Sequence, residues 1–200
     1  MGMSVIKSSV IKALLAGFIT SMAIVISGCS SDTSSPAKLY LLPVSQAKPI
    51  VLQTAPVLMV KTDLDDYLNQ AGLVYRTSTT EVTQAKNNLW AQRISEQVTQ
   101  RIIHDLRSKQ GHYWPVELNA ISERGQPSQL YIRMQEFNGV YTGNAEISGE
   151  WTLRDGAGQM IEHQYFNINV PLKDAGYPAL VTALSTGLDQ LTDKLAKQLK

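Results

Sequence analysis

The chain has 200 residues, a formal net charge of +1, 44% hydrophobic residues and one cysteine. Its 18 Lys and Arg residues nearly balance 17 Asp and Glu residues, and no basic face or run stands out, which argues against a nucleic-acid partner. A single cysteine excludes a disulfide within the chain, so the fold has to be stabilised by packing.

The N-terminus has the parts of a bacterial lipoprotein signal. Lys7 and Lys12 form a positive region, and residues 13–26 form an uncharged, mostly apolar segment. Such a segment typically has ~7–15 residues in a signal peptide, fewer than the ~20 that a membrane-spanning helix needs. An isoleucine, a serine, a glycine and a cysteine then follow one another, ending at Cys29. This pattern predicts cleavage before Cys29 and lipidation of its thiol; the alternative is an uncleaved anchor helix.

Removal of residues 1–28 would leave 172 residues, enough for one domain with a hydrophobic core. The mature formal charge would be −1, because 16 basic residues would face 17 acidic ones. We expect residues 29–37 to be the lipidated cysteine and a flexible polar tether, and residues 38–200 to be the periplasmic domain. Ser30 and Ser31 follow the cysteine. Because an Asp directly after the cysteine is the retention signal of inner-membrane lipoproteins, we expect an anchor in the outer membrane.

The first half of the domain begins with short apolar segments. Apart from Lys38 and Lys61 at their ends, residues 38–44 and 56–61 are continuously apolar, which predicts two strands buried on both faces. Residues 63–71 are predicted to form a short helix that ends at a glycine. A third short strand is expected over residues 73–77.

A long amphipathic helix is predicted over residues 88–108. Its apolar residues recur every fourth position, from Trp90 and Ile94 to Leu106, and form one stripe. The extended segment at residues 112–118 contains a proline, which favours an edge strand.

The second half predicts a long antiparallel ribbon and a final helix. Residues 129–140 alternate until Phe137, where the change of phase predicts a bulge near Glu136. Residues 155–158 predict the turn of a hairpin. Residues 177–200 form a second amphipathic helix, predicted to pack on the sheet; a subunit contact is the alternative. The fold class is therefore α/β: a single domain with a twisted mixed sheet, a long C-terminal hairpin and two main amphipathic helices.

Residues that carry out chemistry do not cluster in the sequence. Three histidines lie in three different elements: His104, His112 and His163. No nucleophile elbow, phosphate loop, zinc-protease motif or dinucleotide motif is present. The acidic residues at 63, 65 and 66 lack the glycine and the closing glutamate of a calcium loop. We therefore predict no metal, no cofactor and no enzymatic activity; an enzyme assembled from dispersed residues remains the alternative.

Three segments resemble the ABC-type transport auxiliary lipoproteins. Residues 39–43, shortly after the predicted lipidated cysteine, are similar to the family's Tyr-x-Leu-x-Pro opening. Residues 65–68 and 74–76 are similar to its Tyr-Leu-Asp and Ile-Val-x-Arg segments, although Asn69 stands where an acid is usual. Residues 90–93 are similar to its Trp-Ala-Glu-Pro, with Gln and Arg in place of Glu and Pro. The resemblance covers essentially the whole mature chain and looks closest to the paraquat-inducible lipoproteins of MCE-type systems.

This resemblance implies a non-enzymatic lipoprotein of a lipid transport system. In such systems an inner-membrane complex carries MCE-domain proteins that form a tube across the periplasm. The lipoprotein would sit at the outer membrane, dock the end of the tube and support envelope integrity. Some family members assemble as rings, so a homo-oligomer is a further expectation. A second hypothesis is an envelope-structural lipoprotein that binds peptidoglycan or an outer-membrane assembly machine.

The segments behind the resemblance supply three candidate partner contacts: Tyr67, Arg76 and Trp90. Tyr, Trp and Arg are enriched among the residues that dominate binding energy at interfaces. The alternative for Arg76 is a surface ion pair with Asp65 or Asp66. The alternative for Trp90 is packing of the long helix on the sheet.

Overall fold

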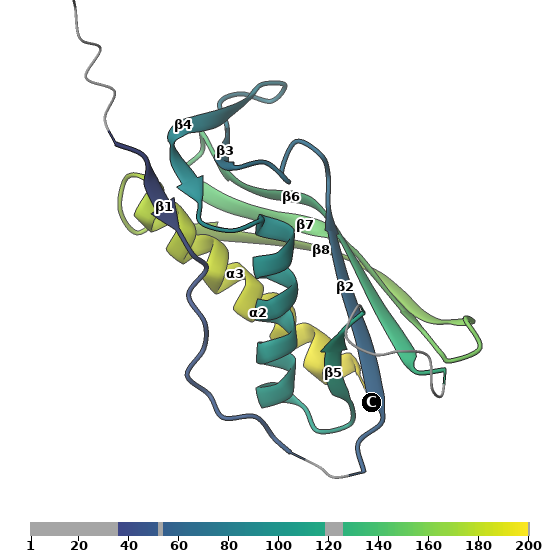
Figure 1. Cartoon of the computed structure of the whole chain (residues 1–200). Helices are drawn as coiled ribbons and strands as arrows, with labels where there is room; N and C mark the ends of the chain where they lie inside the picture. Colours follow the sequence, from purple (N-terminus) through teal and green to yellow (C-terminus); the bar gives the residue numbers. More distant parts are fainter. Residues whose placement is uncertain (1–35, 52–53, 119–125, 200) are drawn as a thin grey trace, which may run out of the picture. The chain divides into compact units, whose positions relative to one another are not determined.

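The structure is a computed structural model that describes residues 36–51, 54–118 and 126–199 (Figure 1). The predicted signal peptide, Cys29 and most of the predicted tether lie outside the described residues. Within the part of the chain that is described, no helix has the length and apolarity to cross a membrane. The elements are β1 (Lys38–Tyr40), β2 (Val57–Leu64), β3 (Gly72–Arg76), β4 (Val82–Trp90), α2 (Ile94–Lys109), β5 (Trp114–Glu117), β6 (Ser128–Val140), β7 (Asn144–Arg154), β8 (Met160–Pro171) and α3 (Tyr177–Gln198).

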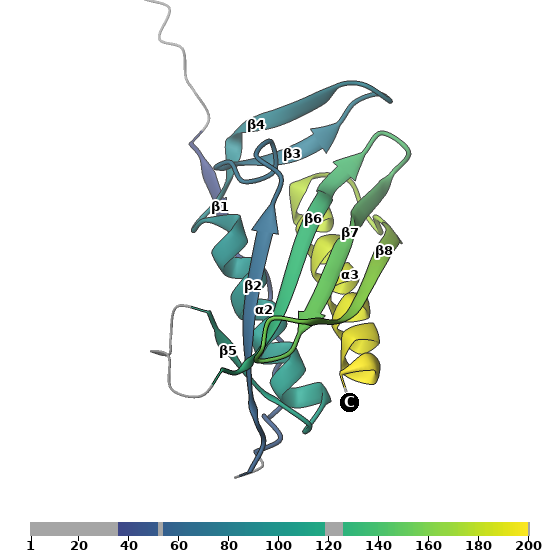
Figure 2. The same ribbon diagram turned by 90° about the vertical axis from the view of Figure 1, so that its right-hand side faces the viewer.

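Strand β6 organises an eight-stranded mixed sheet. One edge of β6 pairs antiparallel with β7, which in turn pairs with β8. The other edge is shared, since residues 128–134 pair in parallel with β2 and residues 139–140 pair in parallel with β3. The sheet therefore forks at β6, with β2 and β5 on one branch and β3, β4 and β1 on the other (Figure 2). The α/β class and the C-terminal hairpin are confirmed.

The bulge predicted near Glu136 is confirmed. The register between β6 and β7 shifts between Met134 and Glu136. Opposite the bulge, a Cβ atom on Gly149 would stand 2.0 Å from the carbonyl oxygen of Arg133, so only glycine fits this close approach of two backbones. Beyond the bulge Phe137 is buried in the core, whereas Glu136 is partly exposed.

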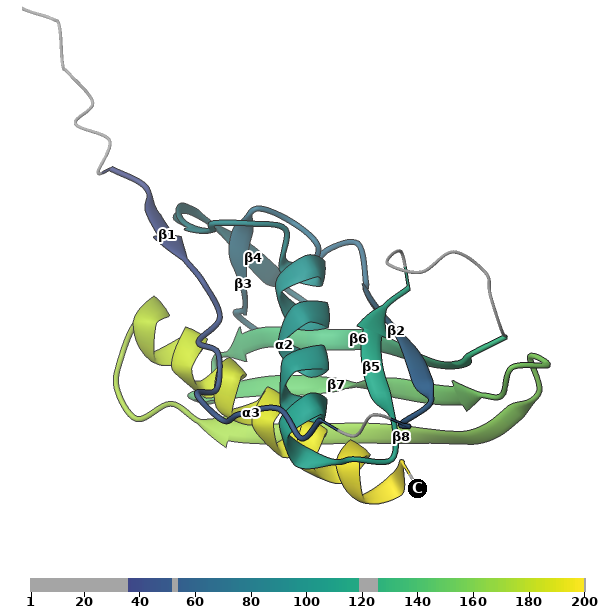
Figure 3. The ribbon, with the colours of Figure 1, turned by 60° about the horizontal axis from the view of Figure 1, so that its bottom comes forward.

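Both helices cover the same face of the sheet (Figure 3). Helix α3 contacts β6, β7 and β8, and helix α2 contacts β2, β5 and α3. The predicted stripes are buried: Ile94, Val98, Ile102 and Leu106 on α2, and Leu184, Leu188, Leu191 and Leu195 on α3. Full burial of one such side chain stabilises the fold by about 1.5–3 kcal/mol. The prediction that the C-terminal helix packs on the sheet is confirmed.

The start of the long helix was predicted wrongly. Helix α2 begins at Ile94, not at residue 88, and the preceding residues form β4, whose last residue is Trp90. The four-residue spacing of Trp90 and Ile94 imitates a helical stripe. Antiparallel pairing with β3 keeps this segment extended, and the Trp90 amide donates to the carbonyl oxygen of Ala71 at 2.7 Å.

The short helix predicted at residues 63–71 is also wrong. Asp63 and Leu64 end β2, because their parallel pairing with Arg133 and Met134 of β6 holds them extended. Only one turn follows, in which the Leu68 amide donates to the Asp65 carbonyl oxygen at 2.8 Å.

Burial of the first strand on both faces is a third incorrect prediction. Strand β1 has three residues and pairs only with β4, at the end of one branch. Leu39 and Leu41 are therefore 65% and 58% exposed, whereas Leu42 is buried.

Residues 36–51, which we call the anchor-proximal segment, are hydrogen-bonded to the helices. The Leu42 amide donates to Oε1 of Gln97 at 2.9 Å, and the Ile50 amide donates to the Arg107 carbonyl oxygen at 2.7 Å. The Pro43 carbonyl oxygen accepts a hydrogen bond from the Arg101 guanidinium. The segment that leads toward the predicted anchor is thus tied to the core at several points.

Candidate functional site

Tyr67 and Arg76, two of the three predicted contact residues, lie together where the sheet forks. Tyr67 belongs to the connection between β2 and β3, and Arg76 ends β3 in register with Val140 of β6. Figure 2 views the sheet from the face opposite the helices. Arg76 points to this helix-free face, since its partner on β7, Glu146, lies between the buried residues Ala145 and Ile147.

Arg76 is held by two carboxylates. Its Nη2 atom lies 2.5 Å from Oε1 of Glu136, and its Nη1 atom lies 3.7 Å from Oε2 of Glu146. The second oxygen of Glu136 accepts a hydrogen bond from Oγ of Ser148 at 2.7 Å. We call Tyr67, Arg76, Glu136, Glu146 and Ser148 the fork cluster.

Arg76 forms the ion pairs of the fork cluster and not the surface ion pair with Asp65 or Asp66 that was considered as its alternative. Asp65 pairs with Arg133 instead, at 3.1 Å between Oδ1 and Nη2. The side chains of Arg76 and Glu136 are only 26% and 22% exposed, so this pair is partly shielded from water. The pairing of Arg76 with Asp65 or Asp66 is therefore wrong.

The bulge of β6 positions Tyr67. The Tyr67 hydroxyl donates to the carbonyl oxygen of Gln135, the residue at the register shift, at 2.7 Å. Burial raises the pKa of the Tyr67 phenol above its ordinary value; Arg76 opposes this shift, whereas Glu136 and Asp65 add to it. Tyr67 therefore acts as a neutral hydrogen-bond donor at physiological pH.

The electrostatics of Arg76 follow from the same contacts. Burial alone would lower the pKa of the Arg76 guanidinium, but the hydrogen bond and the charge of Glu136 outweigh it, with a further contribution from Glu146. The net effect raises the pKa of Arg76. The guanidinium is a permanent cation that contacts two carboxylates, one of which also accepts the Ser148 hydroxyl.

Replacement of Tyr67 by phenylalanine should destabilise the fold by about 1 kcal/mol at neutral pH, because one intramolecular hydrogen bond is lost. The raised pKa also predicts a pH dependence. The contribution of the neutral phenol is fully present below the unfolded-state pKa of about 10, and it is lost as the pH rises through the higher folded-state pKa. Urea unfolding of wild type and Tyr67→Phe from neutral to alkaline pH measures both effects. If the difference in the free energy of unfolding between wild type and Tyr67→Phe is the same at all pH values, the assignment is contradicted.

Trp90 lies apart from the fork cluster. Its side chain is 7% exposed, and its ring centroid lies 6.4 Å from that of Phe137. The structure thus gives Trp90 the packing role that was its alternative, although from a strand rather than from the helix. Cys29, the predicted lipidation site, lies outside the described residues.

The sequence did not identify Glu136 and Glu146, the acidic residues of the fork cluster. Glu136 had one signal, the change of phase in β6, whereas Glu146 and Ser148 are brought in by the register of β6 and β7. Among the described residues, no three His, Cys, Asp or Glu side chains gather so as to hold a metal ion.

Comparison with known proteins gives consistent results. Residues 40–196 match the family model described as the ABC-type transport auxiliary lipoprotein component. The intermembrane transport lipoprotein PqiC of Escherichia coli (strain K12) is 31% identical over 185 residues, which cover 91% of this chain and 96% of that protein. The PqiC protein of Shigella flexneri matches to the same extent.

Two crystal structures share the fold. An uncharacterized protein has a TM-score of 0.71 and 26% identity, and the match covers 82% of this chain and 99% of that one. A protein from Xanthomonas campestris has a TM-score of 0.65 and 19% identity, and the match covers 81% and 95% of the two chains.

Proposed function

Because the chain belongs to the ABC-type transport auxiliary lipoprotein family, we propose that it is a non-enzymatic, lipid-anchored docking subunit of an intermembrane lipid transport system. In this proposal Cys29 carries the lipid, the anchor lies in the outer membrane, and the domain faces the periplasm. The domain docks the end of a tube of MCE-domain proteins that belongs to an inner-membrane complex.

The fork cluster is the observation that carries the docking proposal. Its side chains come from β3, β6 and β7 and from the connection that Tyr67 occupies, so their positions are fixed by the sheet. A surface whose side chains are held in place before binding loses little conformational entropy when a partner binds. Tyr and Arg are also enriched among the residues that dominate interface energy.

The same contacts favour a binding role over catalysis. Arg76 is paired with Glu136 and Glu146, and Glu136 also accepts the hydroxyl of Ser148. A nucleophile needs a neighbouring base that can take its proton. In the fork cluster the Ser148 hydroxyl donates to the Glu136 carboxylate, which already pairs with the Arg76 guanidinium.

Crosslinking in intact cells tests the docking proposal. A photoreactive residue is placed at Gln135, which is exposed beside the fork cluster, and as a control at Lys194, which is exposed on α3. We expect an MCE-domain protein to be captured from position 135 and not from position 194. Capture of peptidoglycan fragments in its place, or of no MCE-domain protein from position 135, would contradict the proposal.

Replacement of Arg76 by lysine should reduce partner capture at least about fivefold, the loss that defines an important interface residue. Lysine keeps the charge but cannot contact Glu136 and Glu146 through one planar fork. The matched control is Arg154→Lys, on the same face at the far end of β7. Co-purification from solubilised membranes measures the effect, and equal capture by both variants would remove Arg76 from the interface.

A further inference from the structure

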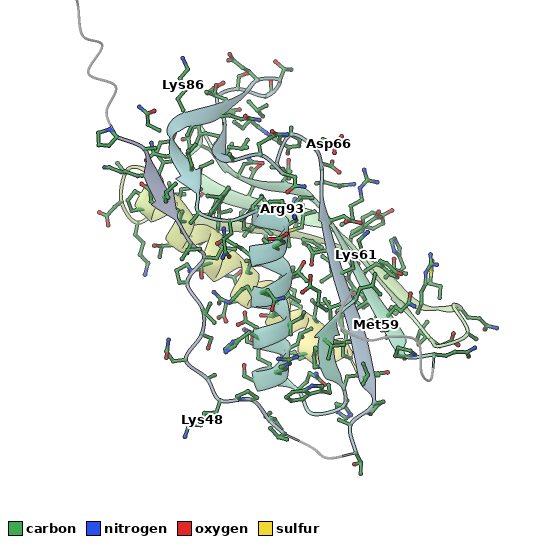
Figure 4. All side chains as sticks on the ribbon, in the orientation of Figure 1. Lys48, Met59, Lys61, Asp66, Lys86 and Arg93 are labelled. Atoms are coloured by element: carbon green, nitrogen blue, oxygen red, sulfur yellow. The ribbon has the colours of Figure 1, made fainter. Side chains whose placement is uncertain are left out.

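A second polar surface lies on the helix side of the sheet. The space between the second half of β2, the first turns of α2 and the end of β5 forms a cleft of about 550 Å³, which we call the β2–α2 cleft. Figure 4 labels three of its residues: Lys61 on β2, Asp66 just beyond β2 and Arg93 at the start of α2. No residue of the fork cluster lines it.

The charges in the β2–α2 cleft leave an excess of carboxylates. The cation of Lys61 lies 3.0 Å from Oδ2 of Asp63, and that of Arg93 lies 2.8 Å from Oε1 of Glu96. Each cation in the lining is thus neutralised by one carboxylate of the cleft.

The remaining carboxylates are those of Asp66 and Glu117. Glu117 accepts a hydrogen bond from the neutral amide of Gln100 at 2.7 Å. In the described part of the chain neither carboxylate has a salt-bridge partner. The cleft is therefore suited to a ligand with two positive charges.

An unpaired hydroxyl in the wall also indicates a ligand. Thr62 is 5% exposed and lines the β2–α2 cleft. It shares a face of β2 with the buried residues Val60 and Leu64, which is the face toward α2. Its Oγ1 atom is itself buried and has no hydrogen-bond partner among the described residues. Because unpaired buried polar atoms are costly, this position calls for a partner that supplies a donor or an acceptor.

A metal ion does not fit this arrangement. Among the residues that the structure describes, no three acidic, His or Cys side chains come close enough to coordinate an ion. Asp66 and Glu117 belong to different elements, the connection after β2 and the end of strand β5. An extended polypeptide offers what the cleft lacks, namely cationic side chains at intervals and main-chain groups between them.

We propose that the β2–α2 cleft binds an extended segment of a partner protein that carries Lys or Arg side chains. These side chains pair with Asp66 and Glu117, and rotation of the Thr62 side chain about its Cα–Cβ bond lets Oγ1 hydrogen-bond to a main-chain group of the segment. This inference goes beyond the docking role of the fork cluster, since the two surfaces share no residue.

Fluorescence anisotropy with the full mature lipoprotein in detergent tests the proposal. The probes are a labelled peptide of alternating Gly and Lys and a second peptide in which Glu replaces Lys. We expect only the Lys peptide to bind, with an affinity that falls as salt screens the charges. Spermidine and Ca²⁺ are titrated separately. Binding of either one without binding of the Lys peptide would overturn the proposal, as would equal binding of both peptides.

Substitutions of the two unpaired carboxylates test whether the Lys peptide binds in the β2–α2 cleft. Asp66→Asn and Glu117→Gln should each weaken binding of the Lys peptide by about threefold to tenfold, because the net contribution of one hydrogen-bonded contact is about 0.5–1.5 kcal/mol. Asp174→Asn removes the same charge at an exposed position between β8 and α3 and should leave the affinity unchanged. Unchanged binding in the double variant of Asp66 and Glu117 would overturn the assignment of the cleft.

Thr62→Val separates a ligand contact from a structural defect. Valine has a similar shape but removes the unpaired hydroxyl, so the thermal midpoint should stay constant or rise while the peptide binds more weakly. A higher midpoint with unchanged peptide affinity would remove Thr62 from the site. Arg76→Lys should leave the peptide affinity unchanged, so that failure of the fork-cluster proposal and failure of the cleft proposal can be told apart.

Discussion

Replacement of Asp105 by alanine is expected to destabilise the protein by about 3–5 kcal/mol, because it leaves a buried guanidinium without its hydrogen-bonded counter-ion. Asp105 is fully buried and Arg101 is 6% exposed. Both carboxylate oxygens of Asp105 accept hydrogen bonds from Nε of Arg101, at 2.9 and 2.8 Å. The other acid near Arg101 is Asp189, whose Oδ1 lies 3.8 Å from Nη2 and whose side chain is half exposed, so it offsets only part of the loss.

The loss of stability should extend beyond α2, because the Arg101–Asp105 pair connects α2, α3 and the anchor-proximal segment. Arg101 also donates to Oγ of Ser185 on α3, at 2.7 Å, and to the Pro43 carbonyl oxygen of the anchor-proximal segment. The hydroxyl of Thr192 on α3 donates to Asp105 at 3.2 Å. Urea unfolding of Asp105→Ala measures the effect on the free energy of unfolding.

Two further variants make this prediction specific. Glu96→Ala removes a carboxylate from the same helix, but its pair with Arg93 is largely exposed, so the expected loss is at most about 1 kcal/mol. The double variant Arg101→Met, Asp105→Leu removes both charges and should recover much of the lost stability. A loss below about 1 kcal/mol for Asp105→Ala would show that Arg101 gains another partner in the variant.

Elements with a strong periodic pattern could be predicted from the sequence. The leucines of α3 and the apolar stripe of α2 define buried helix faces, and the phase change at Phe137 locates the bulge. Strand β4 lacks such a pattern, since only Ala85 and Trp90 of its nine residues are buried. Its extended conformation comes from antiparallel pairing with β3, which precedes it across a short turn, and from pairing with β1, which is distant in the sequence.

The same limit applies to side-chain networks. The spacing of Arg101 and Asp105 matches an ordinary i, i+4 pair on a helix surface. The pair is buried because α3 and the anchor-proximal segment cover it, and neither contact can be read from α2 alone. Tyr67 and Arg76 were found through the family resemblance, whereas their neighbours on β7 depend on sheet register.

Replacement of Cys29 by alanine is expected to abolish membrane association of the protein. The prediction rests on the residues around Cys29, which have the pattern of a lipoprotein signal. Each CH₂ group of an acyl chain buried in the bilayer contributes about 0.8 kcal/mol, and stable anchoring needs more than one chain. Loss of the thiol removes all of these chains together. Fractionation of cells followed by mass determination of the mature N-terminus measures both anchoring and lipidation.

Ser30→Asp is the matched control, since it keeps the thiol and changes only the sorting signal. The variant should remain lipidated but move from the outer to the inner membrane, as lipoproteins with Asp after the cysteine do. If docking requires the outer membrane, crosslinking from position 135 to the MCE-domain partner should fall in Ser30→Asp although the domain itself is unchanged. Retention of Cys29→Ala in the membrane fraction would indicate the uncleaved anchor helix instead. Outer-membrane location of Ser30→Asp would show that another feature of the chain determines sorting.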